Sequence, residues 1–524
     1  MRFLTYASGL TTLTAASIVV ASDSVSGKFS FYTPSWEGWD EHAMRWSSWK
    51  APTFSAIFKP ETESELSQGM AFLSRNNMSY LATKNSGHGN SPTLGAYQDV
   101  VQLNLEKFRH VAINQDYTVT VGGGAKWMDL IPVLHSAGRE LTVGSFPCVG
   151  VHGVVLGGGM GRLMGTYSLT SDALRRAKVA LWDGTIVEAS EEENSDLFWA
   201  IRGAGHNFGV VLESTFETWP DKGGLHYNAD MVFTDDSIEG VLTVANRVIE
   251  EGLDPAVGLI IGYVFNTDFM KPLLVVNIVY AHNEEAGRQL VSNFAPTPEG
   301  AENPIRQLFF NETMLTFAEL GSGAAVPGVC DGNQHQDLYT ASSPTMFDIS
   351  TMKQVYESFG ALIQANPAGN SSILLFETTS RDAIAAFPSD YTAYGHRGKL
   401  GTNAIIQMTW DGADDDSVLD AALDTWGKET RDLLAQPKVS GYDQPYVYIN
   451  YANDDESLSA VYGYESWRHQ RLTELKKKYD PHGFFNAYHP IPAEIGGWDP
   501  REKSSKWSIP FLGKQVAGVL KEEL

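Results

Sequence analysis

Three glycine clusters constrain this chain more than any other feature of its sequence. They are SGHG at residues 86–89, VGVHGVVLGGGMG at residues 149–161 and GAGHNFGVV at residues 203–211. Backbone without side chains lets a phosphate or a planar ring approach closely, and turned N–H groups then bind oxygen anions. No G-K-[ST] follows any cluster, and Arg162 stands where a dinucleotide fingerprint would need its third glycine. Taken singly, each cluster also fits a set of tight turns; together they predict a nucleotide-like ligand on glycine-rich loops.

Length and charge limit the classes of protein to which the chain can belong. The 524 residues allow two or three domains. The hydrophobic fraction of 43% and the charged fraction of 19% are typical of a soluble globular protein. A formal net charge of −25 argues against nucleic acid or an anionic membrane as a partner.

The two ends of the chain carry targeting patterns. Arg2 precedes a mostly apolar run from Leu4 to Val20 with small residues at its end, which predicts a signal peptide over residues 1–21. A first core helix is the alternative. The chain ends KEEL at residues 521–524, close to the K-D-E-L retention signal, although an acidic terminus that ends in leucine by chance explains it equally well. We expect a secretory-pathway protein that is secreted or retained in the endoplasmic reticulum.

Two further patterns bear on the secretory pathway. N-x-[ST] sequons predict a glycoprotein modified at Asn77, Asn311 and Asn370. The only cysteines are Cys148 and Cys330, so the fold is not built on disulfides. A bridge between the two is an open alternative, but we do not expect it because Cys148 sits in a glycine-rich motif with another role.

Strand and helix patterns divide the chain into a first α+β or α/β domain that ends near Pro220 and a second domain. In the first, a capping box at residues 62–65 predicts a helix to about Asn76, among short strands such as residues 80–83 and 177–182. From residue 222 to 440, strands such as 259–265 and 404–410 alternate with helices, which predicts a sheet covered by helices on one face. Residues 446–451 are expected as a further strand and residues 467–479 as a helix, before a polar tail from residue 496.

The order of motifs from about Pro52 to Pro492 resembles one flavoprotein family. The segments are KNSGHGNS, TVGGGAKWMDL, FPCVGVHGVVLGGGMGRLMGTYSLTSDAL, DLFWAIRGAGHNFGVVLESTFETWP, YVYINYANDD and LKKKYDPHGFFNAYHPIP. In this sequence and order they resemble the berberine-bridge-enzyme-like branch, fungal type, of the vanillyl-alcohol-oxidase/p-cresol-methylhydroxylase superfamily. The resemblance implies an α+β fold: a two-part FAD-binding domain over residues 22–221, an α/β substrate domain with an antiparallel sheet over 222–440, and a C-terminal segment, 441–495, that returns to the FAD domain.

The resemblance also implies where FAD binds. His88 matches the histidine that bonds the flavin 8α-methyl group. Phe146 fills the position where many members carry a second attachment cysteine, and Cys148 lies two residues further on, so we expect attachment at His88 alone. His152 replaces a family glycine, and it either lines the flavin or fills space. The implied cofactor-binding residues are Lys84, Asn85, Ser86, Gly87, His88, Gly89, Phe146, Pro147, Cys148, Val149, Gly150, His152, Gly153, Gly157, Gly158, Gly159, Gly205, Gly209, Val210, Val211 and Asn486.

The family's Y-x-N-Y pattern places the catalytic side chains. It is matched by Tyr448 and Tyr451, and the hypothesis is that Tyr451 is the base, or its hydrogen-bonded assistant, while Tyr448 positions the substrate. A pair of core aromatics is the alternative. Gln407 lies near a family position that holds Gln or Glu, on one strand face with Ile405 and Thr409. The weaker candidates are Tyr446, Glu377, His396 and Arg397. Asp414 to Asp416 read as a solvated loop, and no metal site is expected because neither HExxH nor a cysteine–histidine spacing occurs.

These features together predict an FAD-dependent oxidoreductase, with oxidase favoured over dehydrogenase. The resemblance suggests O2 as the acceptor, because Val149 stands where a small valine goes with oxidase behaviour in plant relatives. The expected substrate is a small alcohol, phenol or amine of specialised metabolism. A carbohydrate oxidase, a non-redox cyclase and a binding protein on the same scaffold are the alternatives, and the absent second attachment cysteine leads us away from the carbohydrate oxidases.

Overall fold

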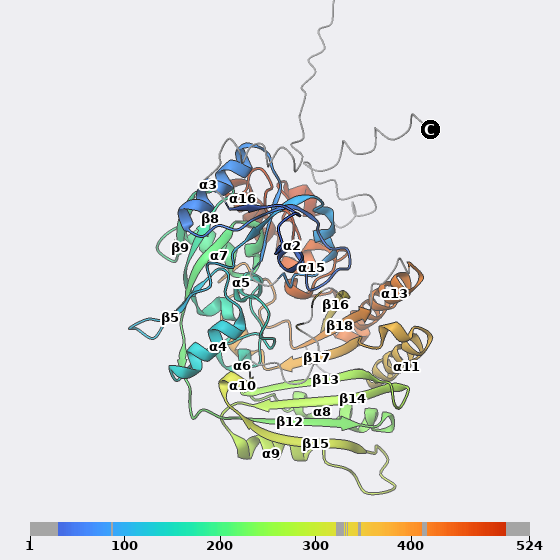
Figure 1. Ribbon diagram of the computed structural model, residues 1–524. Coiled ribbons are helices and arrows are strands. Elements are labelled where there is room, and N and C mark those ends of the chain that lie inside the picture. Colours follow the sequence, from blue (N-terminus) through green and yellow to red (C-terminus); the bar gives the residue numbers. More distant parts are fainter. Residues whose placement is uncertain are drawn as a thin grey trace, which may run out of the picture.

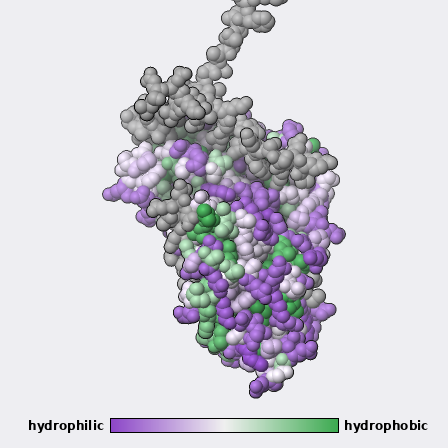
Figure 2. Space-filling model, turned by 90° about the vertical axis from the view of Figure 1, so that its right-hand side faces the viewer, coloured by the Kyte–Doolittle hydropathy of each residue, from purple (hydrophilic) through white to green (hydrophobic). Residues whose placement is uncertain are grey.

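The computed structural model describes residues 30–84, 87–320, 330, 332, 334–343, 347–410 and 417–498. The predicted signal peptide, the aspartates at 414–416, the KEEL terminus and two cofactor candidates, Asn85 and Ser86, lie outside the described residues. Among the helices that are described, none has the length and apolar character needed to cross a bilayer. The face seen from the right of Figure 1 is largely hydrophilic, interrupted by small apolar areas (Figure 2).

Two small sheets form the upper part of the molecule in Figure 1. The four-stranded sheet has the order β1-β2-β4-β3, and β4 runs parallel to both β2 and β3. The five-stranded sheet has the order β5-β6-β10-β8-β9 and is antiparallel throughout. The bounds are β1 (Phe31–Tyr32), β2 (Phe54–Phe58), β3 (Tyr80–Lys84), β4 (Val100–Asn104), β5 (Val111–Ile113), β6 (Val119–Gly122), β8 (Leu174–Ala180), β9 (Ile186–Ser190) and β10 (Val210–Phe216).

One helix between these strands begins where the sequence predicts it. The helix α3 (Glu63–Arg75) starts at Thr62, whose side chain accepts a hydrogen bond from the Glu65 N–H, so the predicted cap is confirmed. The other helices of this part are α2 (Trp39–Ala43), α4 (Trp127–Ser136), α5 (Val151–Val155), α6 (Met164–Tyr167) and α7 (Ser195–Ala204). This part of the molecule also contains a short antiparallel ladder of two strands, β7 (Arg139–Glu140) and β11 (Trp219–Pro220).

The predicted second sheet is confirmed as a seven-stranded, fully antiparallel sheet of order β15-β12-β14-β13-β17-β18-β16, in the lower part of Figure 1. Its strands are β12 (His226–Phe233), β13 (Val257–Asn266), β14 (Lys271–Tyr280), β15 (Gln307–Leu315), β16 (His335–Ser343), β17 (Ile373–Thr379) and β18 (Thr402–Trp410). The main helices against it are α8 (Ile238–Glu250), α9 (Glu284–Ser292), α11 (Ile349–Ala365) and α13 (Ser417–Leu434).

Period-two alternation gives this sheet two different faces. Ile261, Phe376 and Ile406 belong to the core shared with the helices. Their strand neighbours Glu377 and Ile405 point to the opposite face, which turns toward the two small sheets. The helix-covered face therefore holds the domain together, and the other face is available for a site.

The C-terminal segment returns to the upper half, where its red helices lie beside the first-half elements (Figure 1). The predicted helix is confirmed as α16 (Ser466–Tyr479), which packs on α7. The strand expected at residues 446–451 is wrong: Ile449–Tyr451 is a single 3-10 turn after extended chain. The Tyr451 N–H bonds back to the Tyr448 carbonyl, and the Asn450 side chain bonds Val154 O, so no ladder partner is available.

The structure corrects the expectation for the cysteines. Cys148 and Cys330 form a disulfide, with a Cα–Cα separation of 5.8 Å. The two residues are 182 positions apart and belong to different parts of the fold, so only the packing of the large sheet against the small ones brings them together. Cys148 does not line the central cavity, which leaves its sulfur free to pair. All three sequon asparagines, Asn77, Asn311 and Asn370, are exposed.

Candidate active site

A cavity of about 330 Å³ lies between the large sheet and the two small sheets. Its first wall is built from the loop after β3, the loop before α5 and the start of β10. Its second wall is the open face of β13, β17 and β18, and the C-terminal segment closes it with Tyr448, Asn450, Tyr451 and Tyr488. The cavity thus joins all the segments that the motif analysis singled out.

His88 faces this cavity directly after β3. Its ring stacks on Trp46 with 4.2 Å between centroids and 15° between planes. Its Nε2 is buried and has no hydrogen-bond partner among the described residues. Burial, together with smaller contributions from the charges of Arg45 and Lys126, lowers the pKa of His88 to about 4. A neutral imidazole held rigidly, with an unused nitrogen, is suited to a bond with a ligand.

Arg45 supplies a buried positive charge to the same wall. Its Nη2 donates to Gly89 O at 2.7 Å, whereas Nε and Nη1 are buried without a hydrogen-bond partner in the described part of the chain. Burial lowers the pKa of this guanidinium to about 10, so it remains a cation at neutral pH. An enclosed cation with free donors fits an anionic group such as a diphosphate. The sequence reasoning missed Arg45 and Trp46 because they precede the glycine motifs.

The structure separates the predicted cofactor residues into two groups. Gly153 is an example of a residue that borders open space, because a Cβ built there would meet no atom within 4 Å. Those that line the cavity are His88, Gly89, Phe146, Val149, Gly150, His152, Gly153, Gly209, Val210 and Val211. Those that do not are Gly87, Pro147, Cys148, Gly157, Gly158, Gly159, Gly205 and Asn486, while Lys84 is described by its backbone alone.

The glycines of the second group serve packing within the protein. A Cβ on Gly157 would come within 2.2 Å of Asn450 Oδ1, and one on Gly158 within 2.9 Å of the Tyr394 ring. Gly158 and Gly159 also have positive φ, which a side chain would strain. Gly157 thus lets the C-terminal segment sit close to it, while Gly158 makes room for the Tyr394 ring, so these glycines shape the site indirectly.

His152 is deeply buried at the cavity wall. Both of its ring nitrogens are without a hydrogen-bond partner among the described residues. Burial lowers its pKa to about 4, with a smaller contribution from His110, so the ring is neutral at physiological pH. It lines the cavity, as one of the two sequence-based interpretations expected.

Tyr448 is held by three donors. Its hydroxyl oxygen accepts hydrogen bonds from Gly159 N at 3.2 Å, Met160 N at 3.1 Å and Asn450 Nδ2 at 2.7 Å. Burial raises the pKa of Tyr448 to about 12 even though these donors favour the anion. The hydroxyl therefore stays protonated, and with its lone pairs occupied its own hydrogen is left for the cavity.

Tyr451 and Glu377 meet at the centre of the second wall. The Tyr451 hydroxyl donates to Glu377 Oε2 at 3.5 Å, and its ring lies perpendicular to Tyr448 with 5.0 Å between centroids. Burial and the neighbouring carboxylate raise the pKa of Tyr451 well above its ordinary value. Burial also raises the pKa of Glu377, while Arg162 and the Tyr451 hydroxyl oppose that shift. Of the two, Glu377 is better suited to accept a proton, because its ordinary pKa is far lower than that of a tyrosine and Arg162 favours its carboxylate.

Arg162 is a further site residue that the sequence reasoning read only as a missing glycine. It lines the cavity and donates to Asn277 Oδ1 at 2.5 Å. Its pKa is lowered by burial, and Glu377 and Asp230 oppose that shift. Its charge is the main favourable partner of the Glu377 carboxylate.

The remaining substrate-side candidates lie apart from this pair. Gln407 lines the cavity and bonds Gln336 and Thr409, but in the β17–β18 register it pairs with Ile373. Ile373 is four residues from Glu377, which corresponds to ~13 Å along the strand. Neither His396, which bonds Val461 O, nor Arg397, in a buried ion pair with Asp172, lines the cavity.

The fold and this site define a flavin-binding oxidoreductase with a lid of C-terminal aromatic residues. Residues 54–190 match the model of an FAD binding domain, and residues 447–492 match the model described as berberine and berberine like. The FAD-linked oxidoreductase OXR1 of Pyricularia oryzae is 32% identical over 460 residues, covering 87% of this chain and 88% of that protein. The chain belongs to the berberine-bridge-enzyme-like family of FAD-linked oxidoreductases, as the motif resemblance implied.

Solved structures agree on the fold. A xylooligosaccharide oxidase from Myceliophthora thermophila C1 superposes with a TM-score of 0.73 at 20% identity, over 89% of this chain and 98% of that one. A glucooligosaccharide oxidase from Acremonium strictum, described as carrying a 6-S-cysteinyl, 8α-N1-histidyl FAD, gives a TM-score of 0.70 at 19% identity over 91% and 98%. The expected α+β architecture of the superfamily is thereby confirmed.

Proposed function

We propose that this FAD-linked oxidoreductase dehydrogenates a small, largely apolar alcohol, phenol or amine and delivers the electrons to O2. The observation that carries the substrate class is the open face of the large sheet. That face lines the cavity with Ile260, Ile373, Leu375 and Ile405, and its central polar group is the Glu377 carboxylate. A sugar chain would need many hydrogen-bonding groups there, because an unpaired buried hydroxyl is costly.

The residues of the first wall fit the FAD that the family implies. The unpartnered His88 nitrogen, the free donors of Arg45 and the open space above Gly153 are the observations that favour it. We propose covalent attachment through His88 alone, since Phe146 holds the second position and the Cys148 sulfur is committed to a disulfide. When bound, the flavin accepts a hydride from the substrate C–H bond.

Residues of the second wall and of the C-terminal segment bind the substrate and accept its proton. A substrate oxygen or nitrogen above Tyr448 would accept the hydrogen that this tyrosine directs into the cavity. The substrate O–H or N–H gives its proton to the Tyr451 oxygen while the Tyr451 proton passes to the ionised form of Glu377 at Oε2, a form that the Arg162 charge favours. The product gains a C=O or C=N bond, and O2 takes up the two electrons and two protons as hydrogen peroxide.

The test is an anaerobic substrate screen. Purified enzyme is mixed with panels of aromatic and aliphatic alcohols, amines and mono- and oligosaccharides, and loss of the oxidised flavin absorption is followed. Bleaching by an aromatic or apolar alcohol or amine, with peroxide formed on adding air, supports the proposal. Bleaching by saccharides alone would overturn the substrate class, and no peroxide on aeration would overturn the use of O2.

We also propose that the protein passes through the secretory pathway as a glycoprotein. The exposed sequon asparagines and the disulfide support this, because disulfides persist in oxidising compartments. Treatment of the purified native protein with an N-glycosidase tests it. An unchanged mass would count against glycosylation, and a protein that retains residues 1–21 would count against the signal peptide.

A further inference from the structure

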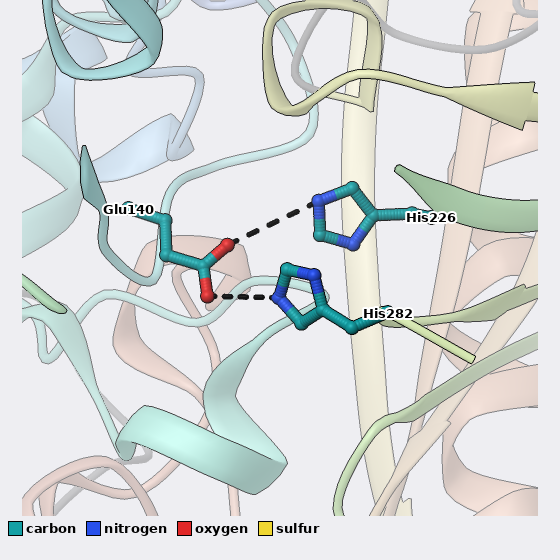
Figure 3. A group of neighbouring side chains, drawn as sticks. All are labelled: Glu140, His226 and His282. Atoms are coloured by element: carbon teal, nitrogen blue, oxygen red, sulfur yellow. Dashed lines mark hydrogen bonds and ion pairs between the residues drawn. The ribbon is translucent and has the colours of Figure 1, made fainter. Parts of the chain in front are cut away.

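Three side chains from separate segments converge away from the cavity, at the junction of the two halves (Figure 3). Glu140 comes from β7, His226 opens β12 and His282 follows β14. In Figure 3 the Glu140 carboxylate faces both imidazole rings. Glu140 Oε1 lies 2.9 Å from His282 Nε2, and Oε2 lies 4.0 Å from His226 Nε2.

Several polar atoms of this group are buried and have no hydrogen-bond partner among the described residues. The side chains of Glu140 and His226 are fully buried, and that of His282 is 14% exposed. Glu140 Oε2 and both nitrogens of His226 have no hydrogen-bond partner among the described residues. A buried polar atom without a hydrogen-bond partner costs folding free energy and is rare in proteins. A ligand bound to this group would remove that cost.

The spacing suits a small divalent cation. One ligand atom from each of the three residues lies within 4.8 Å of the others. Zinc bound at 2.0–2.1 Å in a tetrahedron separates its ligand atoms by ~3.3 Å, so a separation of 4.8 Å must shrink by about 1.5 Å, a change that movements of under about 1 Å in each of two side chains supply. Two imidazoles and one carboxylate are a donor set that zinc prefers, and their mixed N/O character disfavours calcium and magnesium.

The surrounding groups orient the ligands. The Tyr167 hydroxyl donates to Glu140 Oε1, which leaves Oε2 for another partner. Asp221 Oδ1 lies 3.8 Å from His282 Nδ1 and accepts hydrogen bonds from the Gly223 and Gly224 N–H groups. A carboxylate on that side favours the His282 tautomer with its proton on Nδ1, which makes Nε2, now hydrogen-bonded to Glu140 Oε1, available to a metal.

We propose that Glu140, His226 and His282 form a Zn²⁺ site that fastens the FAD-binding half to the large sheet. The site joins β7 to the start of β12 and the end of β14, and none of its residues lines the active-site cavity. Its role is therefore structural. The linear sequence gave no such indication, because the ligands come one by one from distant segments and match no metal motif.

The experiment uses untagged, full-length holoenzyme. After dialysis against metal-free buffer, bound metal is measured by mass spectrometry, and zinc affinity is obtained by competition with a chromogenic chelator. We expect about one zinc per chain, an absorption band in the visible after exchange with Co²⁺, and a lower Tm with chelator. A metal content near zero after purification in zinc, with a Tm insensitive to both zinc and chelator, would overturn the proposal.

Variants separate this site from adventitious binding. His282→Asn is the mildest, since φ at His282 is +59° and asparagine tolerates that conformation. We expect it and Glu140→Gln to lower zinc affinity at least ~100-fold, and Tyr167→Phe to lower it ~10-fold. His110→Asn, at an exposed histidine outside the group, is the matched control and should keep the wild-type affinity. If the three site variants, His282→Asn, Glu140→Gln and Tyr167→Phe, bind zinc as the wild type does, the metal lies elsewhere and the proposal fails. If His282→Asn and Glu140→Gln fold poorly, the Co²⁺ spectrum of the wild type still decides.

Discussion

Replacing Glu377 by glutamine tests the proton pathway most directly. Glutamine keeps the size and hydrogen-bonding oxygen of the buried side chain, yet it cannot accept a proton. Tyr451 cannot substitute for it as a base, because its pKa is already raised well above 10 by burial and would remain high in the neutral environment. General-base catalysis is worth ~10²–10⁴ in rate, so Glu377→Gln should slow anaerobic flavin reduction by about that factor, or about 3–5 kcal/mol in the barrier.

The pH dependence of the same rate gives an independent test. The acting form of Glu377 is the carboxylate, and burial raises its pKa above the ordinary 4.5. The rate should therefore be full above that raised pKa and fall as the pH drops through it. Removing the Arg162 charge with Arg162→Gln removes a stabiliser of the carboxylate, so this fall should move to higher pH.

The assay is stopped-flow reduction of the flavin-loaded enzyme by its best substrate, from acid to neutral pH. Tyr451→Phe breaks the relay and should lose a similar factor without losing the flavin, while Glu284→Gln, at an exposed glutamate of α9 outside the cavity, serves as the matched control. The reasoning is refuted if the flavin of the Glu377→Gln variant is reduced at the wild-type rate and if that rate falls at low pH as it does in the wild type. In that case Glu377 is not the terminal proton acceptor.

The remaining predictions concern the cofactor, the disulfide, substrate positioning and the acceptor. His88→Ala should release its flavin on acid denaturation while the wild-type peptide stays yellow; flavin still bound covalently would contradict attachment at His88. Cys148→Ser opens a loop of 182 residues and should lower the free energy of unfolding by up to about 5 kcal/mol, measured by denaturant titration; an unchanged midpoint would contradict it. Tyr448→Phe removes a donor to the substrate and should raise KM more than it lowers kcat, and an unchanged KM would count against positioning. Reduced wild type should reoxidise in air faster than ~1 s⁻¹ and Val149→Leu should do so more slowly; equal rates would argue that Val149 only packs the loop.

Local pattern explains why much of the fold could be read from the sequence. The capping box at Thr62 and the amphipathic run that became α16 are set by nearby residues, and both helices formed as expected. Alternation placed Gln407 on the cavity face of β18, because side chains of a strand switch faces at every residue. The glycine loops and the tyrosine motif marked the right segments, since a close backbone approach needs glycine whatever the rest of the chain does.

What the sequence left open depends on contacts between distant segments. It did not show the Cys148–Cys330 bond, the turn that replaced the strand at Ile449–Tyr451, or the Glu140 group, because their partners come from other sheets. Nor could the sequence identify Glu377 rather than Tyr451 as the base. The pKa of each group depends on burial and on charges such as Arg162, which only the packed structure brings near. The sequence alone thus determined most of the helices and strands, the family and the loops that line the cavity. The tertiary structure decided which side chains meet and in which charge state, because desolvation and Coulomb interactions act across space and not along the chain.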